Sequence, residues 1–246
     1  MIESRFSPTK EILPPAQKEL WSALRPSLDL GFVLYGGTAI ALRLGHRVSV
    51  DFDFFSDQPL DREMLGRAFP FLGNSTVIQD EKETLSLLTP PSKVDGNSVK
   101  VSFFGSIGFG RVGEPESTRD GVMRVASLDD LMATKVKTVL QRVSAKDYMD
   151  IASMVEAGVS LAKGLASARA MFGMNFQPSE SMKAMIYFEG GDLHLLTPRT
   201  KEILSKAVAE VRELPEVTIA SRTLHPMTKS PEENPRVSSR QGLSPG

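Results

Sequence analysis

The 246-residue sequence contains no cysteine, and its charges nearly cancel, with 29 Lys and Arg against 30 Asp and Glu. Without thiolates, the chain forms neither a disulfide scaffold nor a cysteine-based zinc site. A net charge of −1 argues against a broadly basic surface for bulk nucleic-acid binding, but it leaves room for a local basic patch. Hydrophobic residues make up 41% of the chain, which excludes a largely disordered protein. We therefore expect a globular protein in a reducing compartment.

Long hydrophobic runs are also missing. The longest uncharged stretch, from Leu30 to Leu42, has 13 residues and is broken by two glycines, whereas a membrane-spanning helix needs about 20. The first 15 residues contain no apolar segment of the kind that follows the charges of a secretory signal. These features predict a cytoplasmic protein without membrane contact.

Hydrophobic periodicity divides the chain into three parts. Residues 1–126 mix short strand patterns with short helices, whereas residues 127–216 are helical throughout. Ser127 and Ser144 each begin a pattern typical of a helix capping box. Residues 217–246 hold four of the 16 prolines and few large apolar side chains, which predicts a disordered tail. Strands are expected at 31–35, 48–55, 75–88, 98–104 and 124–126.

A glycine turn joins the first of these strands to a helix. Gly36 and Gly37 follow the apolar run 31–35, and a helical pattern begins at Thr38. Glycines allow the backbone to approach an anion closely, and a helix N-terminus offers free N–H groups and the positive end of a dipole. A Gly-Gly turn between strand and helix is more often a simple packing turn, so this feature alone is a weak indication of a phosphate site.

The next strand carries two acidic residues on one face. Strict alternation over 48–55 places Asp51 and Asp53 on the same side, about 7 Å apart. Carboxylates are the hard oxygen ligands that Mg²⁺ prefers, and the metal in turn bridges phosphate oxygens. The pair could also be the solvated face of an edge strand. Haloacid-dehalogenase-type phosphatases place a threonine two positions after the pair, where this chain has Phe55, and metal-dependent glycosyltransferases lack the preceding Gly-Gly helix. The combination favours a polymerase-β-like nucleotidyltransferase.

The segment 35–56 resembles the AbiEii/AbiGii-type nucleotidyltransferase toxin family, whose signature runs Gly-Gly-Thr, a helix, then Arg-x-Ser-x-Asp-x-Asp. The matching residues here are Gly36, Gly37, Thr38, Arg47, Ser49, Asp51 and Asp53. The family's second motif, Lys…Arg…(Arg/Lys)-Asp-x-x-Asp, falls on Lys135, Arg142, Lys146, Asp147 and Asp150. The resemblance spans roughly residues 15–215.

This resemblance implies an α+β protein with two lobes, a nucleotidyltransferase core of mixed sheet with flanking helices, followed by a helical lobe. Asp51 and Asp53 would hold Mg²⁺, and the nucleoside triphosphate would lie between the lobes. The residues expected to bind the nucleotide are Gly36, Gly37, Thr38, Arg47, Ser49, Lys135 and Arg142. Some family members act on tRNA ends, and some are toxins neutralised by an antitoxin.

The second motif also has simpler explanations. Asp147 stands at the third position of the helix expected to begin after Ser144, where capping alone would explain it. Asp150 could pair with Lys146 one turn earlier. In the family interpretation, Lys135 contacts phosphate, and both aspartates orient the basic groups or assist catalysis.

One feature departs from many polymerase-β-like enzymes. They carry a third carboxylate on a later strand, whereas the strand 98–104 offers Ser102 and no acidic residue lies between Asp95 and Glu114. Three hypotheses therefore stay open: a nucleotidyltransferase acting on an acceptor such as tRNA, an inactive nucleotide-binding regulatory module, and an enzyme that modifies a small molecule.

Overall fold

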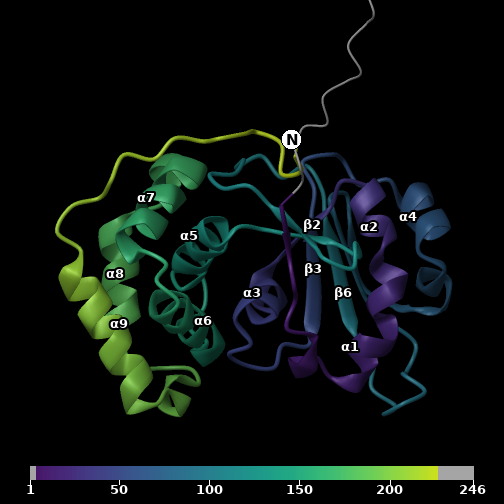
Figure 1. Ribbon diagram of the computed structural model, residues 1–246, viewed down its shortest axis with the longest axis horizontal. Coiled ribbons are helices and arrows are strands. Elements are labelled where there is room, and N and C mark those ends of the chain that lie inside the picture. Colours follow the sequence, from purple (N-terminus) through teal and green to yellow (C-terminus); the bar gives the residue numbers. More distant parts are fainter. Residues whose placement is uncertain (1–3, 227–246) are drawn as a thin grey trace, which may run out of the picture.

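The computed structural model describes residues 4–226, and within that range eight strands form one mixed sheet. Their order across the sheet is β1-β7-β8-β2-β3-β6-β5-β4. Figure 1 shows α1, α2 and α4 on one side of this sheet, and α3 with the later helices on the other. The strands are β1 (Arg5–Phe6), β2 (Val33–Tyr35), β3 (Asp51–Phe55), β4 (Thr76–Glu81), β5 (Thr84–Leu88), β6 (Lys100–Phe104), β7 (Glu116–Thr118) and β8 (Arg124–Val125).

Alternation along the central strands separates a hydrophobic face from a functional one. Phe52 and Phe54 of β3 are fully buried, and Phe54 stacks on Phe103 of β6 with ring centroids 5.6 Å apart. Phe32 and Phe69 contact the same ring of Phe103. This aromatic core lies beneath α1 (Pro15–Leu20), α2 (Pro26–Asp29) and α4 (Arg62–Ala68). The opposite residues of β3, including both aspartates, consequently face α3 (Gly36–Leu44) and the helical lobe.

One expected strand is in fact two. The segment 75–88 forms the hairpin β4–β5, which turns at Lys82 and Glu83, with an irregularity in the register between Val77 and Gln79. The turn carries no glycine, proline or asparagine, so the usual turn residues do not mark it. All residues of β4 are exposed at the edge of the sheet.

The expected helical lobe comprises α5 (Leu128–Thr138), α6 (Ala145–Glu156), α7 (Leu161–Phe172), α8 (Pro178–Ile186) and α9 (Pro198–Glu210). Ser127 caps α5 as expected, its hydroxyl accepting the Asp130 N–H at 3.1 Å. Ser144 makes no side-chain cap bond, and the carboxylate of Asp192 accepts the Ala145 N–H instead, at 2.6 Å. The carboxylate of Asp147 binds Lys135 and Arg142 rather than the start of its own helix. No helix within residues 4–226 is long and apolar enough to cross a membrane.

The segment after α9 returns to the sheet domain, as the yellow ribbon in Figure 1 shows. The composition assigned residues 217–246 to a disordered tail, but residues 217–226 make defined contacts. The Ala220 N–H donates to the Arg111 carbonyl at 2.9 Å, and the Leu224 N–H donates to Asp57 at 2.9 Å. The Leu224 side chain is fully buried. Residues 227–246 of the expected tail lie outside the described range.

Candidate active site

Gly36 and Gly37 begin α3 immediately after β2, and each has a close neighbour that would have to move to admit a larger residue. A Cβ on Gly36 would lie 2.7 Å from Oδ2 of Asp53, and the backbone of Gly36 has a φ of +76°, which L side chains rarely adopt. A Cβ on Gly37 would lie 2.5 Å from the Arg47 guanidinium. The two glycines therefore allow an acidic and a basic side chain to approach the start of the helix.

Asp51 and Asp53 occupy the same face of β3, as the alternation predicted. They stand opposite Lys100 and Ser102 of β6 in the strand register. Burial, and then the negative charge of Asp51, raises the pKa of Asp53 above its ordinary value. Ser102 donates a hydrogen bond to Asp53 and accepts one from Ser86 at 3.0 Å. Beside Asp53, β6 thus carries a fully buried hydroxyl and no carboxylate.

The two carboxylates fit a divalent cation. Mutual repulsion in a partly buried position is the condition that a bound cation relieves, and two adjacent carboxylates are ligands that Mg²⁺ uses together with substrate phosphates. Within residues 4–226, no cluster of three or more acidic, histidine or cysteine side chains could hold a metal alone. Water molecules and substrate oxygens would complete the coordination by Asp51 and Asp53.

Thr38 directly follows the two glycines, but it does not line the cavity. Its side chain is 1% exposed; its hydroxyl contacts the Asp51 carbonyl oxygen and lies 2.9 Å from the Ser49 hydroxyl. The threonine thus ties α3 to the beginning of β3, next to the acidic pair. Ser49 does line the cavity.

The helical lobe contributes a buried aspartate, Asp147, that binds two basic side chains. Its carboxylate lies 2.6 Å from Nζ of Lys135 and accepts hydrogen bonds of 2.7 and 3.0 Å from Arg142. Burial alone would raise the pKa of Asp147, but the Arg142 hydrogen bonds and the charge of Lys135 outweigh it and hold the pKa below its ordinary value. Asp147 is therefore ionised and weakly basic at neutral pH.

Asp150 joins the helical lobe to the core. It is fully buried, and Arg47 donates two hydrogen bonds to it at 2.7 and 2.8 Å. Lys135 lies 2.8 Å away, and Nε2 of His46 lies 2.7 Å away. Burial opposes ionisation, yet the bonds from His46 and Arg47 and the charge of Lys135 lower the pKa of Asp150 well below its ordinary range. The alternative pairing with Lys146 is replaced by these long-range partners.

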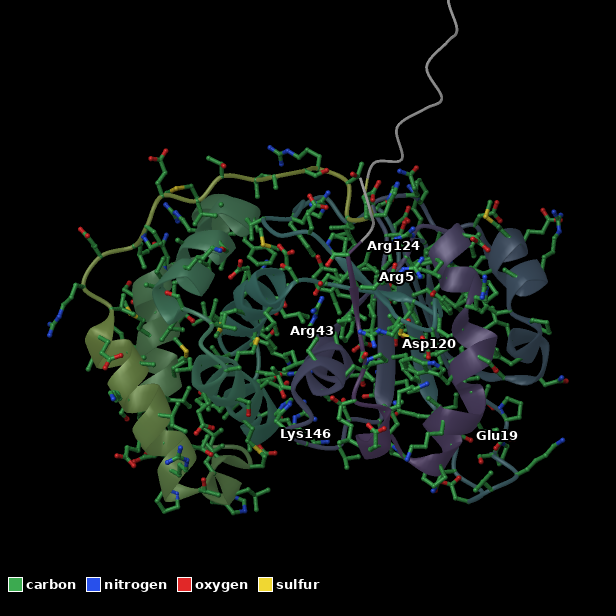
Figure 2. The ribbon with its side chains drawn as sticks, in the orientation of Figure 1. Arg5, Glu19, Arg43, Asp120, Arg124 and Lys146 are labelled. Atoms are coloured by element: carbon green, nitrogen blue, oxygen red, sulfur yellow. The ribbon has the colours of Figure 1, made fainter. Side chains whose placement is uncertain are left out.

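These groups surround a cavity of about 670 Å³ between the sheet and helices α5 and α6. Asp150 and Thr38 do not line it, but each contacts residues that do. In Figure 2 the side chain of Lys146 lies beside α6, on the side toward the sheet. The predicted residues that line the cavity are Gly36, Gly37, Arg47, Ser49, Asp51, Asp53, Lys135, Arg142 and Asp147.

Several lining residues were not identified from the sequence. Lys100 faces the cavity because it stands opposite Asp51, a pairing that only strand register reveals. Phe55 continues the alternation of Asp51 and Asp53, so the period-two pattern contained that signal. His46 does not line the cavity, and its contact with Asp150 spans 104 positions. Arg43, which also flanks the motif, binds Glu116 and backbone carbonyls of β8 and its neighbour instead, and Figure 2 shows it on α3.

Comparisons with known proteins agree with this arrangement. Residues 19–209 match the model of a family described as the nucleotidyl transferase AbiEii toxin of type IV toxin–antitoxin systems. An uncharacterised protein of Aquifex aeolicus (strain VF5) is 31% identical over 179 residues, covering 70% of this chain and 83% of that protein.

Two solved structures share the fold. One is an H. pylori protein described as a candidate nucleotidyltransferase, with a TM-score of 0.52, 18% identity and coverage of 78% of this chain and 92% of that one. The other is the nucleotidyltransferase toxin MenT4 of Mycobacterium tuberculosis H37Rv, with a TM-score of 0.52, 14% identity and coverage of 79% and 82%. The family match covers most of the chain, including both motifs that form the cavity. This protein therefore belongs to the AbiEii nucleotidyltransferase toxin family.

Proposed function

We propose that this protein transfers a nucleoside monophosphate from a nucleoside triphosphate to an acceptor hydroxyl in a Mg²⁺-dependent reaction. The acceptor oxygen forms a bond to the α-phosphorus while the bond to pyrophosphate breaks. The observation that carries the proposal is one shared cavity. It is lined by the acidic pair of β3, by the start of α3, and by the basic side chains of Lys135, Arg142 and Lys146.

The cavity carries an acidic pair for a metal ion and separate basic groups for phosphate oxygens, and the proposed reaction needs both. Asp51 and Asp53 would hold Mg²⁺, which stabilises the charge that develops on the transferred phosphoryl group. Arg47 and Arg142 present guanidinium groups, which suit phosphate oxygens. Lys135 gives two of its three N–H donors to Asp147 and Asp150, and one remains for a phosphate.

Asp147 and Asp150 act in this proposal as positioning residues. Their pKa values are lowered by the cations that bind them, so neither carboxylate readily accepts a proton from the acceptor. Instead, each fixes the direction of a cation that faces the substrate. Their low basicity therefore argues against either aspartate as the general base.

For the acceptor, we favour the end of an RNA such as tRNA. Lys100, Lys146 and Gln141 line the cavity in addition to the groups assigned to the triphosphate, so cationic and polar groups remain for a second, polyanionic substrate. In this proposal the protein is the toxin of a pair, it acts in the cytoplasm, and a separate antitoxin opposes it.

The test is transfer of label from α-labelled nucleoside triphosphates to total tRNA, other RNA, protein and small molecules in the presence of Mg²⁺. The double variant Asp51→Asn with Asp53→Asn should lose transfer, whereas Asp80→Asn, an aspartate on β4 of the same sheet, should retain it. Equal transfer by the double variant would refute the proposal. Label in the small-molecule fraction would instead identify a small-molecule acceptor.

A second candidate is a nucleotide-binding regulatory module without turnover. Ser102, at the position of a third carboxylate, is the observation that favours it. Triphosphate binding by the wild-type protein without transfer to any acceptor class would support this candidate over the first.

A further inference from the structure

The cavity has an aromatic end that the chemistry proposed above does not use. Phe55 follows Asp53 by two residues on the same face of β3, and Phe104 stands opposite it on β6. Both rings line the cavity and are partly exposed. Tyr35 also lines this end but is only 2% exposed. Two phenylalanine rings are therefore open to an occupant of the cavity.

The two rings form a fixed corner. Phe55 stacks on Tyr35 with centroids 4.9 Å apart and planes at 15°, and it meets Phe104 edge to face at 5.0 Å and 74°. Phe109 lies 6.2 Å from Phe55 and itself contacts Phe172 at the end of α7. Neighbouring rings hold Phe55 and Phe104 in place. Binding of a flat aromatic ligand therefore costs little free energy for ordering these two side chains.

The order of groups along β3 suggests which ligand this corner takes. The strand rise separates Asp51, Asp53 and Phe55 by about 7 Å each, with the start of α3 beside the first two. A nucleoside triphosphate has the same order, from phosphates through the reacting phosphorus and the sugar to the base. On the basis of the proposed function, we infer that Phe55 and Phe104 form the nucleobase site, in which the base stacks on the aromatic corner.

Two threonine hydroxyls of the cavity are already engaged as hydrogen-bond donors. Thr134 and Thr138 of α5 line the cavity, but their hydroxyls donate to the carbonyls of Leu131 and Thr134 at 2.9 and 2.8 Å. Stacking does not depend on the hydrogen-bonding edge of a base, and a larger ring system stacks more strongly. The corner therefore favours purines over pyrimidines by ring size.

The experiment compares ligands with and without a base. Dissociation constants for ATP, CTP and inorganic tripolyphosphate are measured by calorimetry with Mg²⁺ on the full-length protein. The variants are Phe55→Leu and Phe104→Leu, and the matched control is Phe71→Leu, a partly buried ring outside the cavity. We expect each corner variant to bind ATP about 5- to 20-fold more weakly and CTP less affected. Tripolyphosphate affinity, and every affinity of the control, should stay within about twofold.

The outcomes separate this inference from the function on which it rests. Equal weakening of ATP and tripolyphosphate, unchanged ATP affinity, or wild-type binding of ATP no tighter than tripolyphosphate would each refute the nucleobase site and leave the proposed function standing. Wild-type protein that binds neither ATP nor tripolyphosphate would refute both.

Discussion

Arg47 of the sheet domain binds Asp150 of α6 through two hydrogen bonds of 2.7 and 2.8 Å, although the residues are 103 positions apart. This two-bond ion pair joins the lobe that carries Asp51 and Asp53 to the lobe that carries Lys135 and Arg142. The guanidinium lines the cavity, whereas the carboxylate is buried behind it. The geometry of the cavity consequently depends on a residue that does not itself line it.

Removal of the Asp150 charge should lower the stability of the protein, although Asp150 does not itself line the cavity. In Asp150→Asn, Arg47 loses the anionic partner that compensates its burial, and Lys135 keeps only Asp147. We expect a loss of about 3–5 kcal/mol in the free energy of unfolding, measured by urea denaturation. Asp129→Asn, which breaks the exposed pair of α5 with Lys163, is the control and should cost less than about 1 kcal/mol. Equal losses in the two variants would contradict the assigned role.

The pH dependence of stability should reveal the same network. Asp147 and Asp150 have pKa values below those of an unfolded chain, where an aspartate titrates at about 3.9. Groups of this kind stabilise the fold above the unfolded-state pKa, and the contribution disappears as the pH falls toward the folded-state pKa. The stability difference between wild type and Asp150→Asn should therefore be largest near pH 7 and shrink below about pH 4. A constant difference between pH 7 and pH 3 would contradict the prediction.

Gly36 can be tested against a glycine with the same backbone conformation and no close neighbour. Gly36→Ala places a Cβ beside Asp53, whereas Gly96→Ala, at a φ of +72°, meets no atom within 4 Å. Both substitutions should cost about 1–2 kcal/mol of stability because alanine disfavours this conformation. Only Gly36→Ala should also reduce nucleotidyl transfer, by at least about tenfold. Retention of full transfer by Gly36→Ala would show that Asp53 tolerates displacement.

The segment after α9 should stabilise the sheet domain. Leu224→Ala removes a fully buried side chain, and we expect a loss of about 2–4 kcal/mol in thermal or urea unfolding. Leu214→Ala, a leucine that is 38% exposed between α9 and this segment, is the control and should cost less than about 1 kcal/mol. Similar small losses in both variants would mean that the contacts of residues 217–226 do not contribute to stability.

Local patterns predicted much of the core because their physical causes are local. The alternation around Asp51 and Asp53 reflects the two-residue period of a strand, and the structure has both on one face. The cap at Ser127 involves groups only three residues apart. No turn-forming residue marks the hairpin at Lys82, so the sequence predicts a single strand there. At the start of α6, Ser144 makes no side-chain cap bond, and a carboxylate from a distant position, Asp192, accepts the Ala145 N–H.

Residue type and short, periodic spacing are enough to identify the family motifs, the acidic pair and the glycine turn. The partners of the charged residues, in contrast, follow from the way the chain folds. Asp147 binds Lys135 and Arg142 instead of capping its helix. Asp150 binds Arg47 and His46. Such pairings depend on how helices pack across a sheet, and the burial that makes them strong arises only when the two lobes meet.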